Sequence, residues 1–414
     1  MASTLFTLDS NALDVLIVGA GISGLTAAIA LRRQGHRVAV YERSSFATEM
    51  GTGIHISPNG ARMLQVIGLP LNDLQYVLVA GMKRYTPLED LHEHNEARNV
   101  AGEAMLMYRP ALHAALKDLA TCHNGSGIPV KIFLNSHLID LDINKPSLTL
   151  STGEEITGDV LLCADGVHSW TRSFIAPGTK PKPYGMSCFR WSLPYEAIMS
   201  DPKTEQYSAM GYMHQWRGYN RRLMSYPTGS HEFICFSAHV PNGRSSEAKF
   251  SWRNTGHKDE LITAFKNFGP GVQHIIRSAP EENLMVFELP DMDELSSWIQ
   301  GHAALLGDAA HPMLPFLGQG AAMAIEDGIC LGAVLSRGVR KFEIPERLRL
   351  YQKLRKPHVT KIQEATREYG WQLDHKPGTG TTFKQLMPTK KFFEDHDEWE
   401  RSSRHLDSIF HPQI

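Results

Sequence analysis

The sequence predicts an α/β protein with a Rossmann-like nucleotide-binding domain, an inserted and mainly antiparallel β-sheet domain, and a helical C-terminus. Residues 14–43 read as strand, glycine-rich turn, helix and strand, and two later buried strands end in Asp165-Gly166 and run into Gly307-Asp308. Residues 181–284 change to aromatic, β-rich segments broken by Pro, Gly and Asn. We therefore expect a discontinuous nucleotide-binding domain (1–180 and 285–360), a substrate-binding sheet domain (181–284) and a C-terminal helical segment (361–414).

The first motif is GAGISG at residues 19–24, which follows the apolar run at 15–18. Gly19 permits the tight turn, Gly21 permits close approach of the backbone to a pyrophosphate, and Gly24 permits packing of helix against strand. Glu42 ends the next strand, where a carboxylate accepts a hydrogen bond from a ribose hydroxyl. This spacing predicts dinucleotide binding; an ordinary glycine-rich turn is the alternative.

The remaining elements follow in chain order. Residues 51–60 (GTGIHISPNG) read as a strand followed by a turn and a helix, with Pro58 and Asn59 at the helix start, and Pro110 suits the first turn of a further helix. Residues 131–134, 138–141 and 148–150 are expected to be antiparallel strands, and 159–164 and 303–306 to be buried strands. Residues 320–335 read as a helix.

Composition narrows the functional classes. A net charge of −2 gives no basic field for nucleic acid or an anionic membrane. The five cysteines are scattered without a CxxC pair, which indicates a reducing compartment and hence the cytoplasm. There is no secretory signal pattern and no apolar run long enough to span a bilayer. Metal-ligand spacing such as HExxH is absent, so we expect no bound metal.

Three ordered stretches carry a family resemblance: GAGISG with Glu42, ADGVHSxxR at 164–172, and LLGDAAHPMLPFLGQGAAMAIED at 305–327. They resemble the fingerprints of group A FAD-dependent aromatic monooxygenases, which have the para-hydroxybenzoate hydroxylase fold. GTGIHISPNG, YRPALHAAL and the SYP segment at 225–227 are most similar to the salicylate-hydroxylase-like branch, in a form typical of fungal secondary metabolism. The resemblance covers most of residues 10–360.

The resemblance implies FAD as cofactor, with NADPH or NADH as a transient reductant. Glu42 is then expected at the adenosine ribose, Arg109 near the pyrophosphate and ribityl chain, and Asp308 at a ribityl hydroxyl. Independently, a helix N-terminus at the Gly318 turn would stabilise negative charge on reduced flavin. The cofactor-binding residues expected in all are Gly19, Gly21, Gly24, Glu42, Arg43, Gly53, Arg109, Asp165, Gly166, Asp308, Pro312, Gly318, Gln319 and Gly320.

The implied reaction inserts one oxygen atom from O₂ into a phenolic, salicylate-like or polyketide ring through a flavin hydroperoxide. The catalytic candidates are His214, Tyr226, Arg190 and His55, although a single histidine in such a position is more often a surface or structural residue than a base. Arg190 or Arg222 suits a substrate carboxylate.

Two other functions stay open: epoxidation or dearomatising hydroxylation of an indole or related ring, and plain Rossmann dinucleotide binding without oxygenation. A flavin halogenase is disfavoured because no WxWxIP signature is present. The expected partners are a small aromatic substrate and O₂, with the chain a monomer or a homodimer.

Overall fold

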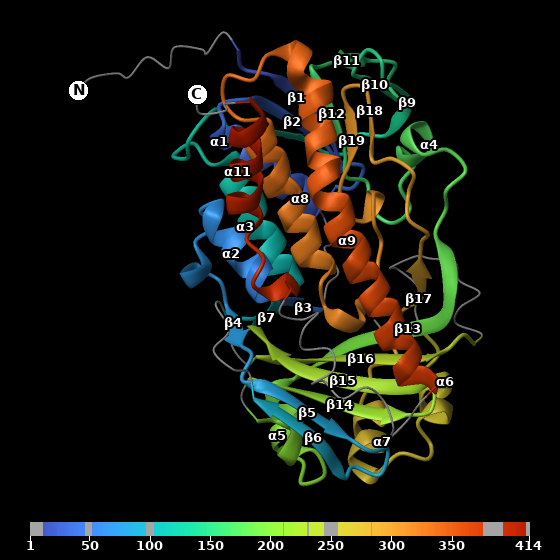
Figure 1. Ribbon diagram of the computed structural model, residues 1–414. Coiled ribbons are helices and arrows are strands. Elements are labelled where there is room, and N and C mark those ends of the chain that lie inside the picture. Colours follow the sequence, from blue (N-terminus) through green and yellow to red (C-terminus); the bar gives the residue numbers. More distant parts are fainter. Residues whose placement is uncertain are drawn as a thin grey trace.

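The computed structural model describes residues 11–45, 52–96, 103–209, 211–229, 232–243, 256–282, 284–375 and 392–410. A helix-covered sheet forms one half of the molecule and a wide, mostly antiparallel sheet forms the other (Figure 1). The long helix α9 (Ile344–His375) runs from the first half down to the second. Among the described helices, none is both long and apolar enough to cross a membrane.

The first half is built on a sheet whose strand order is β18-β19-β12-β1-β2-β8. Its strands are β1 (Asp14–Val18), β2 (Arg37–Tyr41), β8 (Lys131–Phe133), β12 (Val160–Cys163), β18 (Ile299–Gln300) and β19 (Ala303–Leu305). All neighbours pair in parallel except β18 and β19. The expectation that residues 131–134 are antiparallel was wrong, because β8 extends this parallel sheet beside β2. The expected antiparallel pairing does hold for β9 (Leu138–Asp142) and β10 (Ser147–Leu150), with β11 (Glu155–Thr157) on the other side of β10.

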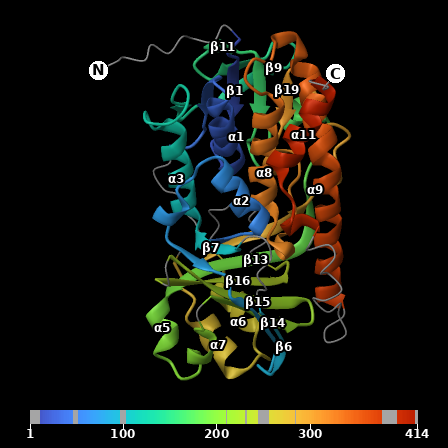
Figure 2. The ribbon, with the colours of Figure 1, turned by 60° about the vertical axis from the view of Figure 1, so that its left-hand side comes forward.

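Helix α1 (Ile22–Arg33) packs over this sheet, whose central strands are apolar on both faces. Helices α3 (Arg109–Thr121) and α8 (Gly320–Val334) pack on α1, and α2 (Pro58–Val66) packs on α8. Helix α1 contacts both α3 and α8, and Figure 2 shows these helices side by side. Pro58 and Pro110 lie in the first turns of α2 and α3, where a missing N–H costs no helical hydrogen bond.

The second half is a sheet with strand order β17-β13-β16-β15-β14-β5-β6. Its strands are β5 (Gly81–Tyr85), β6 (Leu91–Glu96), β13 (Lys182–Pro194), β14 (Tyr212–Gly218), β15 (Arg221–Thr228), β16 (Phe233–Pro241) and β17 (Met285–Asp291). One face buries Trp191, Trp216 and Phe236 against α5 (Tyr195–Met199), α6 (Lys258–Ala264) and α7 (Pro270–Arg277). The sheet is therefore wider than the expected insert at 181–284, because β5 and β6 join it from far upstream.

A small sheet connects the two halves. It has the order β3-β7-β4 and contains β3 (Gly53–Ile56), β4 (Tyr76–Leu78) and β7 (Met105–Tyr108). Tyr226 of β15 donates a hydrogen bond from Oη to the backbone oxygen of Gly53 at 3.0 Å. A Cβ on Gly53 would lie 2.5 Å from the Tyr226 ring, so only glycine lets the two sheets approach this closely.

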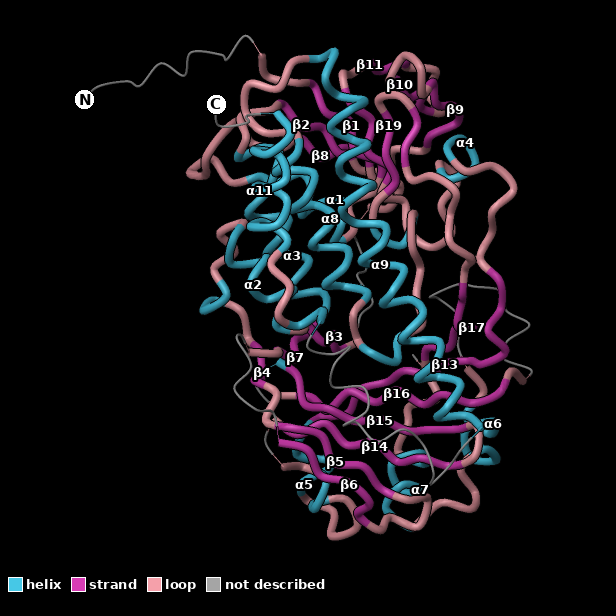
Figure 3. The backbone as a smooth tube through the Cα atoms, viewed as in Figure 1, coloured by secondary structure: helices cyan, strands magenta, loops and turns pink. Residues whose placement is uncertain are grey.

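The C-terminal part is continuous with the first half. Helix α9 passes through the expected boundary at 360/361 without a break, and α11 (Glu398–Phe410) packs on α8. The tube drawing in Figure 3 shows α11 lying among the helices of the first half. The Lys376–Gly380 segment expected to separate two helices lies outside the described residues.

Candidate active site

The glycine-rich turn after β1 has the geometry of an anion site. Gly19 has φ +99°, and a Cβ there would lie 2.5 Å from the backbone oxygen of Ala164. A Cβ on Gly24 would lie 2.1 Å from the backbone oxygen of Gly19. In contrast, a Cβ on Gly21 would meet no atom within 4 Å, so the N-terminus of α1 faces open space. Unpaired N–H groups and the helix dipole make that space favourable for phosphate.

Glu42 is fixed by the turn that it follows. Its Oε2 accepts from the backbone N–H of Ala20 at 2.8 Å, and its Oε1 accepts from that of Ser44 at 2.7 Å. A carboxylate has about four acceptor positions, so Glu42 can still receive a ribose hydroxyl. The next residue, Arg43, is exposed.

Asp165, an expected cofactor-binding residue, is hydrogen-bonded to its own loop. Its carboxylate accepts from the hydroxyls of Ser169 (2.5 Å) and Thr171 (2.7 Å) and from the backbone N–H groups of Trp170 (2.8 Å) and Thr171 (3.0 Å). Because these four bonds use its acceptor capacity, Asp165 shapes its own loop ahead of α4 (Arg172–Ile175). Gly166, with φ +81° and open space at its Cβ position, is the part of this motif left for a ligand.

The three motif turns contact one another directly. A Cβ on Gly307 would lie 2.6 Å from Ser23 Oγ, which places the third turn against the first. Arg172 donates to the backbone oxygens of Asp308 (2.9 Å) and Ala309 (2.7 Å), which joins the second turn to the third. Turns from residues near 20, 165 and 308 therefore lie against one another. A Cβ on Gly21 or Gly166 would meet no atom within 4 Å, and we call the open space in front of these turns the cavity.

Asp308 lines that cavity. Protein surrounds it and raises the pKa of its carboxyl, an effect opposed by the nearby charges of His311, Arg109 and Arg172. Asp308 is nevertheless exposed to water. A side chain that faces an open cavity inside the protein would be both surrounded by protein and exposed in this way. Arg109 and Asp308, 199 positions apart by their numbers, thus lie close enough to interact electrostatically.

The turn before α8 forms another wall. Gly318 has φ +64°, and its backbone oxygen is 3.4 Å from Nδ1 of His55, which places this catalytic candidate at the turn. Gln319 is held by Asn59, whose Nδ2 donates to Gln319 Oε1 at 3.3 Å. Gly320 opens α8, and a Cβ there would meet only Met313, at 3.8 Å. The N-terminus of α8 is therefore approachable, as that of α1 is.

Pro312 is positioned by α9. Its backbone oxygen accepts a hydrogen bond from Gln363 Nε2 at 2.9 Å. Thr366 of the same helix donates to the backbone oxygen of Leu314 at 2.9 Å. The loop between the third turn and α8 thus depends on a helix that the sequence motifs do not include.

Arg190 and Tyr226 share the face of the wide sheet that is turned toward this cavity. Arg190 pairs with Ser237 and Tyr226 with Cys235, and residues two apart on one strand point the same way. Arg190 Nη1 donates to Thr52 Oγ1 at 3.3 Å. Burial raises the pKa of the Tyr226 hydroxyl, so Tyr226 remains a proton-bearing donor at neutral pH.

His214 lies on the opposite face. It pairs with Ser225, the neighbour of Tyr226, and its ring is stacked with Tyr85 and Trp216 in the aromatic core. Its Nδ1 is 3.0 Å from Tyr85 Oη, and burial lowers its pKa to about 3. The structure therefore separates His214 from Arg190, Tyr226 and His55.

Two residues at the cavity face, His239 and Tyr369, were not predicted from the sequence. His239 is directly opposite Arg222, and burial together with Arg222 and Arg190 holds its pKa far below the usual range. Arg222 lies over the ring of Phe316, 3.8 Å from its centroid. From α9, Tyr369 accepts a hydrogen bond from Arg217 Nη2 at 2.6 Å. The sequence of β16 gives one local signal for His239. Ser237 and His239 alternate with the apolar residues Phe236, Ala238 and Val240, so the two polar residues lie on the same face.

Three arginines lie near the Tyr369 hydroxyl at this face. Burial alone would raise that pKa, but the arginines Arg217, Arg84 and Arg222 hold it below the usual value. The sheet face toward the cavity is thus electropositive, and it favours an anionic or readily ionised ligand.

Comparison with known proteins identifies a family and several relatives. The sequence profile of the FAD binding domain family matches residues 12–366. FAD-dependent monooxygenase cfoG of Aspergillus candidus is 32% identical over 376 residues, covering 86% of this chain and 85% of the relative. Hispidin-3-hydroxylase of Neonothopanus nambi is 31% identical over 369 residues, covering 84% of this chain and 86% of the relative.

Solved structures share the fold. The crystal structure of CtdE in complex with FAD and substrate 4 has a TM-score of 0.82 at 22% identity, covering 96% of this chain and 98% of that one. A salicylate hydroxylase substrate complex has a TM-score of 0.76 at 20% identity, covering 95% and 98%.

Proposed function

The chain belongs to the FAD binding domain family and to its FAD-dependent aromatic monooxygenases, and on that basis we propose a specific reaction for it. The protein uses NAD(P)H and O₂ to insert one oxygen atom into a small phenolic, salicylate-like or polyketide ring. The observation that carries the proposal is the convergence of three distant turns on one cavity beside an electropositive sheet face.

The residues of the cavity fit FAD. The open N-terminus of α1 suits the pyrophosphate, Glu42 the ribose, and Asp308 with Arg109 the ribityl region. The approachable N-terminus of α8 suits the electron-rich edge of the ring system, because helix N–H groups stabilise negative charge. When bound, FAD supplies the redox and oxygen chemistry that side chains lack.

We assign Arg190 the anchoring of the substrate. A guanidinium binds a carboxylate through two parallel hydrogen bonds, or donates to the single oxygen of a phenolate, and in both cases it favours the ionised form. Loss of the phenol proton makes the ring more electron-rich, which assists transfer of an electrophilic oxygen atom. Arg222 is the second candidate for this anion, on the same face as Arg190.

Tyr226 and His55 complete the proposed site. Tyr226 keeps its proton and donates to Gly53, so it orients β3 and a bound ring rather than acting as a base. His55, at the Gly318 turn, is the remaining histidine that a substrate hydroxyl can reach for proton transfer. Apolar walls such as Phe287 and Phe316 exclude water from the reacting centre.

The reductant is proposed to bind only transiently. The sequence has a single GxGxxG motif, which we assign to FAD, and no second motif of this kind for a permanently bound nicotinamide cofactor. This supports a reductant that binds, delivers its hydride and dissociates.

The test is substrate-stimulated oxidation of NADH and NADPH by the FAD-loaded protein, with product mass, across salicylates, resorcylates, hydroxylated pyrones and indoles. We expect a phenol or aromatic acid to stimulate oxidation and to gain one oxygen atom. Products that lose aromaticity, obtained only from indoles, would replace the proposal with the epoxidation alternative. Cofactor oxidation that yields only hydrogen peroxide with every compound would contradict it.

A further inference from the structure

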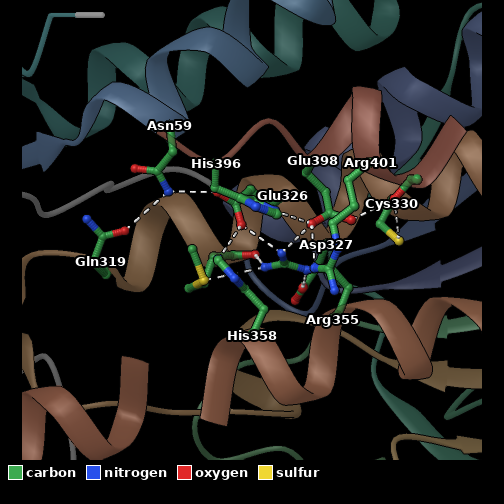
Figure 4. A network of polar contacts seen from close by, with 12 residues as sticks. Asn59, Gln319, Glu326, Asp327, Cys330, Arg355, His358, His396, Glu398 and Arg401 are labelled. Atoms are coloured by element: carbon green, nitrogen blue, oxygen red, sulfur yellow. Dashed lines mark hydrogen bonds and ion pairs between the residues drawn. The ribbon is translucent and has the colours of Figure 1, made fainter. Parts of the chain in front are cut away.

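A completely buried ionic cluster lies behind the cavity, on the side of α8 that carries Glu326 and Asp327 (Figure 4). Arg355 of α9 donates from Nε to Asp327 Oδ1 at 2.8 Å, and from Nη1 to Glu326 Oε2 at 2.7 Å and Glu398 Oε2 at 2.8 Å. These four side chains have no exposed surface. One guanidinium thus joins α8, α9 and α11.

One branch of the cluster reaches the Gly318 turn. Glu326 Oε1 accepts from Asn59 Nδ2 at 2.7 Å, and the same Nδ2 is 3.3 Å from Gln319 Oε1 (Figure 4). Gln319 is the residue immediately before α8 and is itself buried. The position of this turn is therefore tied to Arg355 through two side chains.

A second branch reaches the Asp308 turn. Asp327 Oδ2 accepts from the backbone N–H of Gly307 at 2.8 Å and lies 2.6 Å from His311 Nε2. Although burial raises the pKa of the Asp327 carboxyl, His311 and Arg355 outweigh burial and lower it. Asp327 therefore stays ionised and holds both ends of the turn that carries Asp308.

The third branch leads to the C-terminal helix. Glu398, in the first turn of α11, also accepts from Ser402 Oγ at 2.6 Å and lies 2.7 Å from His396 Nε2. Its pKa is lowered by Arg355 and His396 in spite of burial. A carboxylate in the first turn of a helix also interacts favourably with the helix dipole.

The same region contains a group of residues with metal-ligand chemistry. Ligand atoms of Glu326, His358 and His396 lie within 4.8 Å of one another. Glu326 Oε2 already accepts a hydrogen bond from Arg355 Nη1 at 2.7 Å, and the two imidazole rings are stacked with centroids 4.0 Å apart. Stacked rings do not direct their nitrogen lone pairs at one common ion, so we assign the group to the Arg355 cluster.

We propose that Arg355 is a positioning residue for the flavin site, and that Glu398 makes α11 part of it. Arg355 holds the Asp308 turn through Asp327 and the Gly318 turn through Glu326, and Glu398 fixes the guanidinium that both share. If the Arg355 guanidinium moves, the N-terminus of α8 shifts relative to the flavin, and reduced flavin loses stabilisation. The inference rests on FAD binding; its turnover consequence alone rests on the proposed function.

The test compares Glu398→Gln with Glu400→Gln, an exposed neighbour on the same helix, in the full-length FAD-loaded protein. The midpoint potential is measured with a chemical reductant and a reference dye, without NAD(P)H or substrate. We expect Glu398→Gln to weaken the preference for reduced over oxidised flavin about tenfold, a shift of about −30 mV for a two-electron couple, with Glu400→Gln unchanged. An unchanged potential and visible spectrum in a Glu398→Gln protein that is only less heat-stable would overturn the proposal.

Asn59→Ala provides a second route if Glu398→Gln does not fold, because it removes one neutral link of the Gly318 branch. It should lower the potential in the same direction, and no shift would count against the proposal. If both variants fold, the shift of the double variant should be smaller than the sum of the two, since both substitutions disturb the Gly318 turn; full additivity would refute this shared route. If the potential shifts but the enzyme oxygenates no compound of the panel, the positioning role of Arg355 is supported and only the proposed reaction is rejected.

Discussion

Arg172 Nη2 donates to the backbone oxygen of Asp308 at 2.9 Å, across 136 positions of sequence. Its Nε donates to Ala309, so a buried guanidinium holds the second motif turn against the third. We predict that Arg172→Leu lowers the free energy of unfolding by about 2–4 kcal/mol, because two or more charge-assisted bonds are lost, and weakens FAD binding. Urea unfolding and FAD titration measure the two effects, with exposed Arg349→Leu as the control. A folded Arg172→Leu protein with normal FAD affinity would contradict this role.

Asp308→Ala should lose most of its bound FAD. The exposed carboxylate in the cavity wall is expected to accept a ribityl hydroxyl, and one charge-assisted hydrogen bond corresponds to roughly a 10- to 100-fold change in the dissociation constant. Asp308→Asn keeps an acceptor oxygen, so its FAD retention should lie between that of the unchanged protein and that of Asp308→Ala. The ratio of flavin to protein absorbance after gel filtration measures retention. Full retention by Asp308→Ala would remove Asp308 from the cofactor site.

Glu42→Ala should weaken FAD more than NAD(P)H. The substitution removes the ribose acceptor and also the bond that holds the N–H of Ala20 in the phosphate-binding turn. We expect roughly a tenfold rise in the FAD dissociation constant and little change for the reductant. Separate titrations of FAD into apoprotein and of NAD(P)H into FAD-loaded protein check this. An equal loss for both cofactors would argue against a ribose contact made only by FAD.

Arg190 and His214 should respond differently to substitution. Arg190→Met removes the proposed anion anchor and should lower kcat/KM roughly 10- to 100-fold, with FAD content unchanged. His214→Phe preserves the aromatic stack and loses only the bond to Tyr85, so kcat/KM should change by less than about threefold while the free energy of unfolding falls by about 1–3 kcal/mol. Steady-state kinetics and urea unfolding distinguish the two. A His214→Phe enzyme that folds but is inactive would restore His214 as a catalytic candidate.

Acid should unfold the protein before its carboxylates are protonated. Burial lowers the pKa of His214 to about 3 and that of His358 to about 2, and holds that of His239 far below its usual range. The folded state thus binds fewer protons than the unfolded state, whose histidines titrate near about pH 6.5. Stability is present above that pH and is lost as the pH falls toward 3, at about 1.4 kcal/mol per pH unit for each histidine.

Urea unfolding between pH 7.5 and 4.5 checks this prediction. His214→Phe should reduce the pH slope by one histidine, about 1.4 kcal/mol per unit. An identical slope in His214→Phe would show that His214 is not neutral and buried in solution.

The nucleotide-binding motifs were predictable because their geometry is local. A turn that needs a positive φ at Gly19, or the close approach at Gly24, admits almost only glycine, so the sequence carries the constraint directly. The same applies to the strand that leads into Asp308, where an apolar run and a glycine lie next to each other. Asp165 is the exception within a motif, since its hydrogen bonds to Ser169 and Thr171 depend on the loop conformation.

The sheet residues were less predictable because both faces of the wide sheet are buried. His214 pairs with Ser225, so a difference of one residue from Tyr226 decides between the aromatic core and the cavity. Side chains alternate between the two faces of a sheet along each strand. The sequence therefore shows which residues share a face, but it does not show which face is turned toward the cofactor. Tyr369 and Glu398 arrive from helices far along the chain, and no local pattern marks them.

Strands β5 and β6 join the wide sheet from residues 81–96, while its other members come from residues 182–291. During synthesis the β5–β6 hairpin must therefore wait for nearly two hundred further residues before its parallel neighbour β14 and the strands beyond it are complete. An exchange of specificity between relatives that transplants only the later segment would place a foreign β14 against a native β5. Chimeras therefore need residues 81–96 from the same parent as residues 182–291, because two separate parts of the gene encode this one sheet.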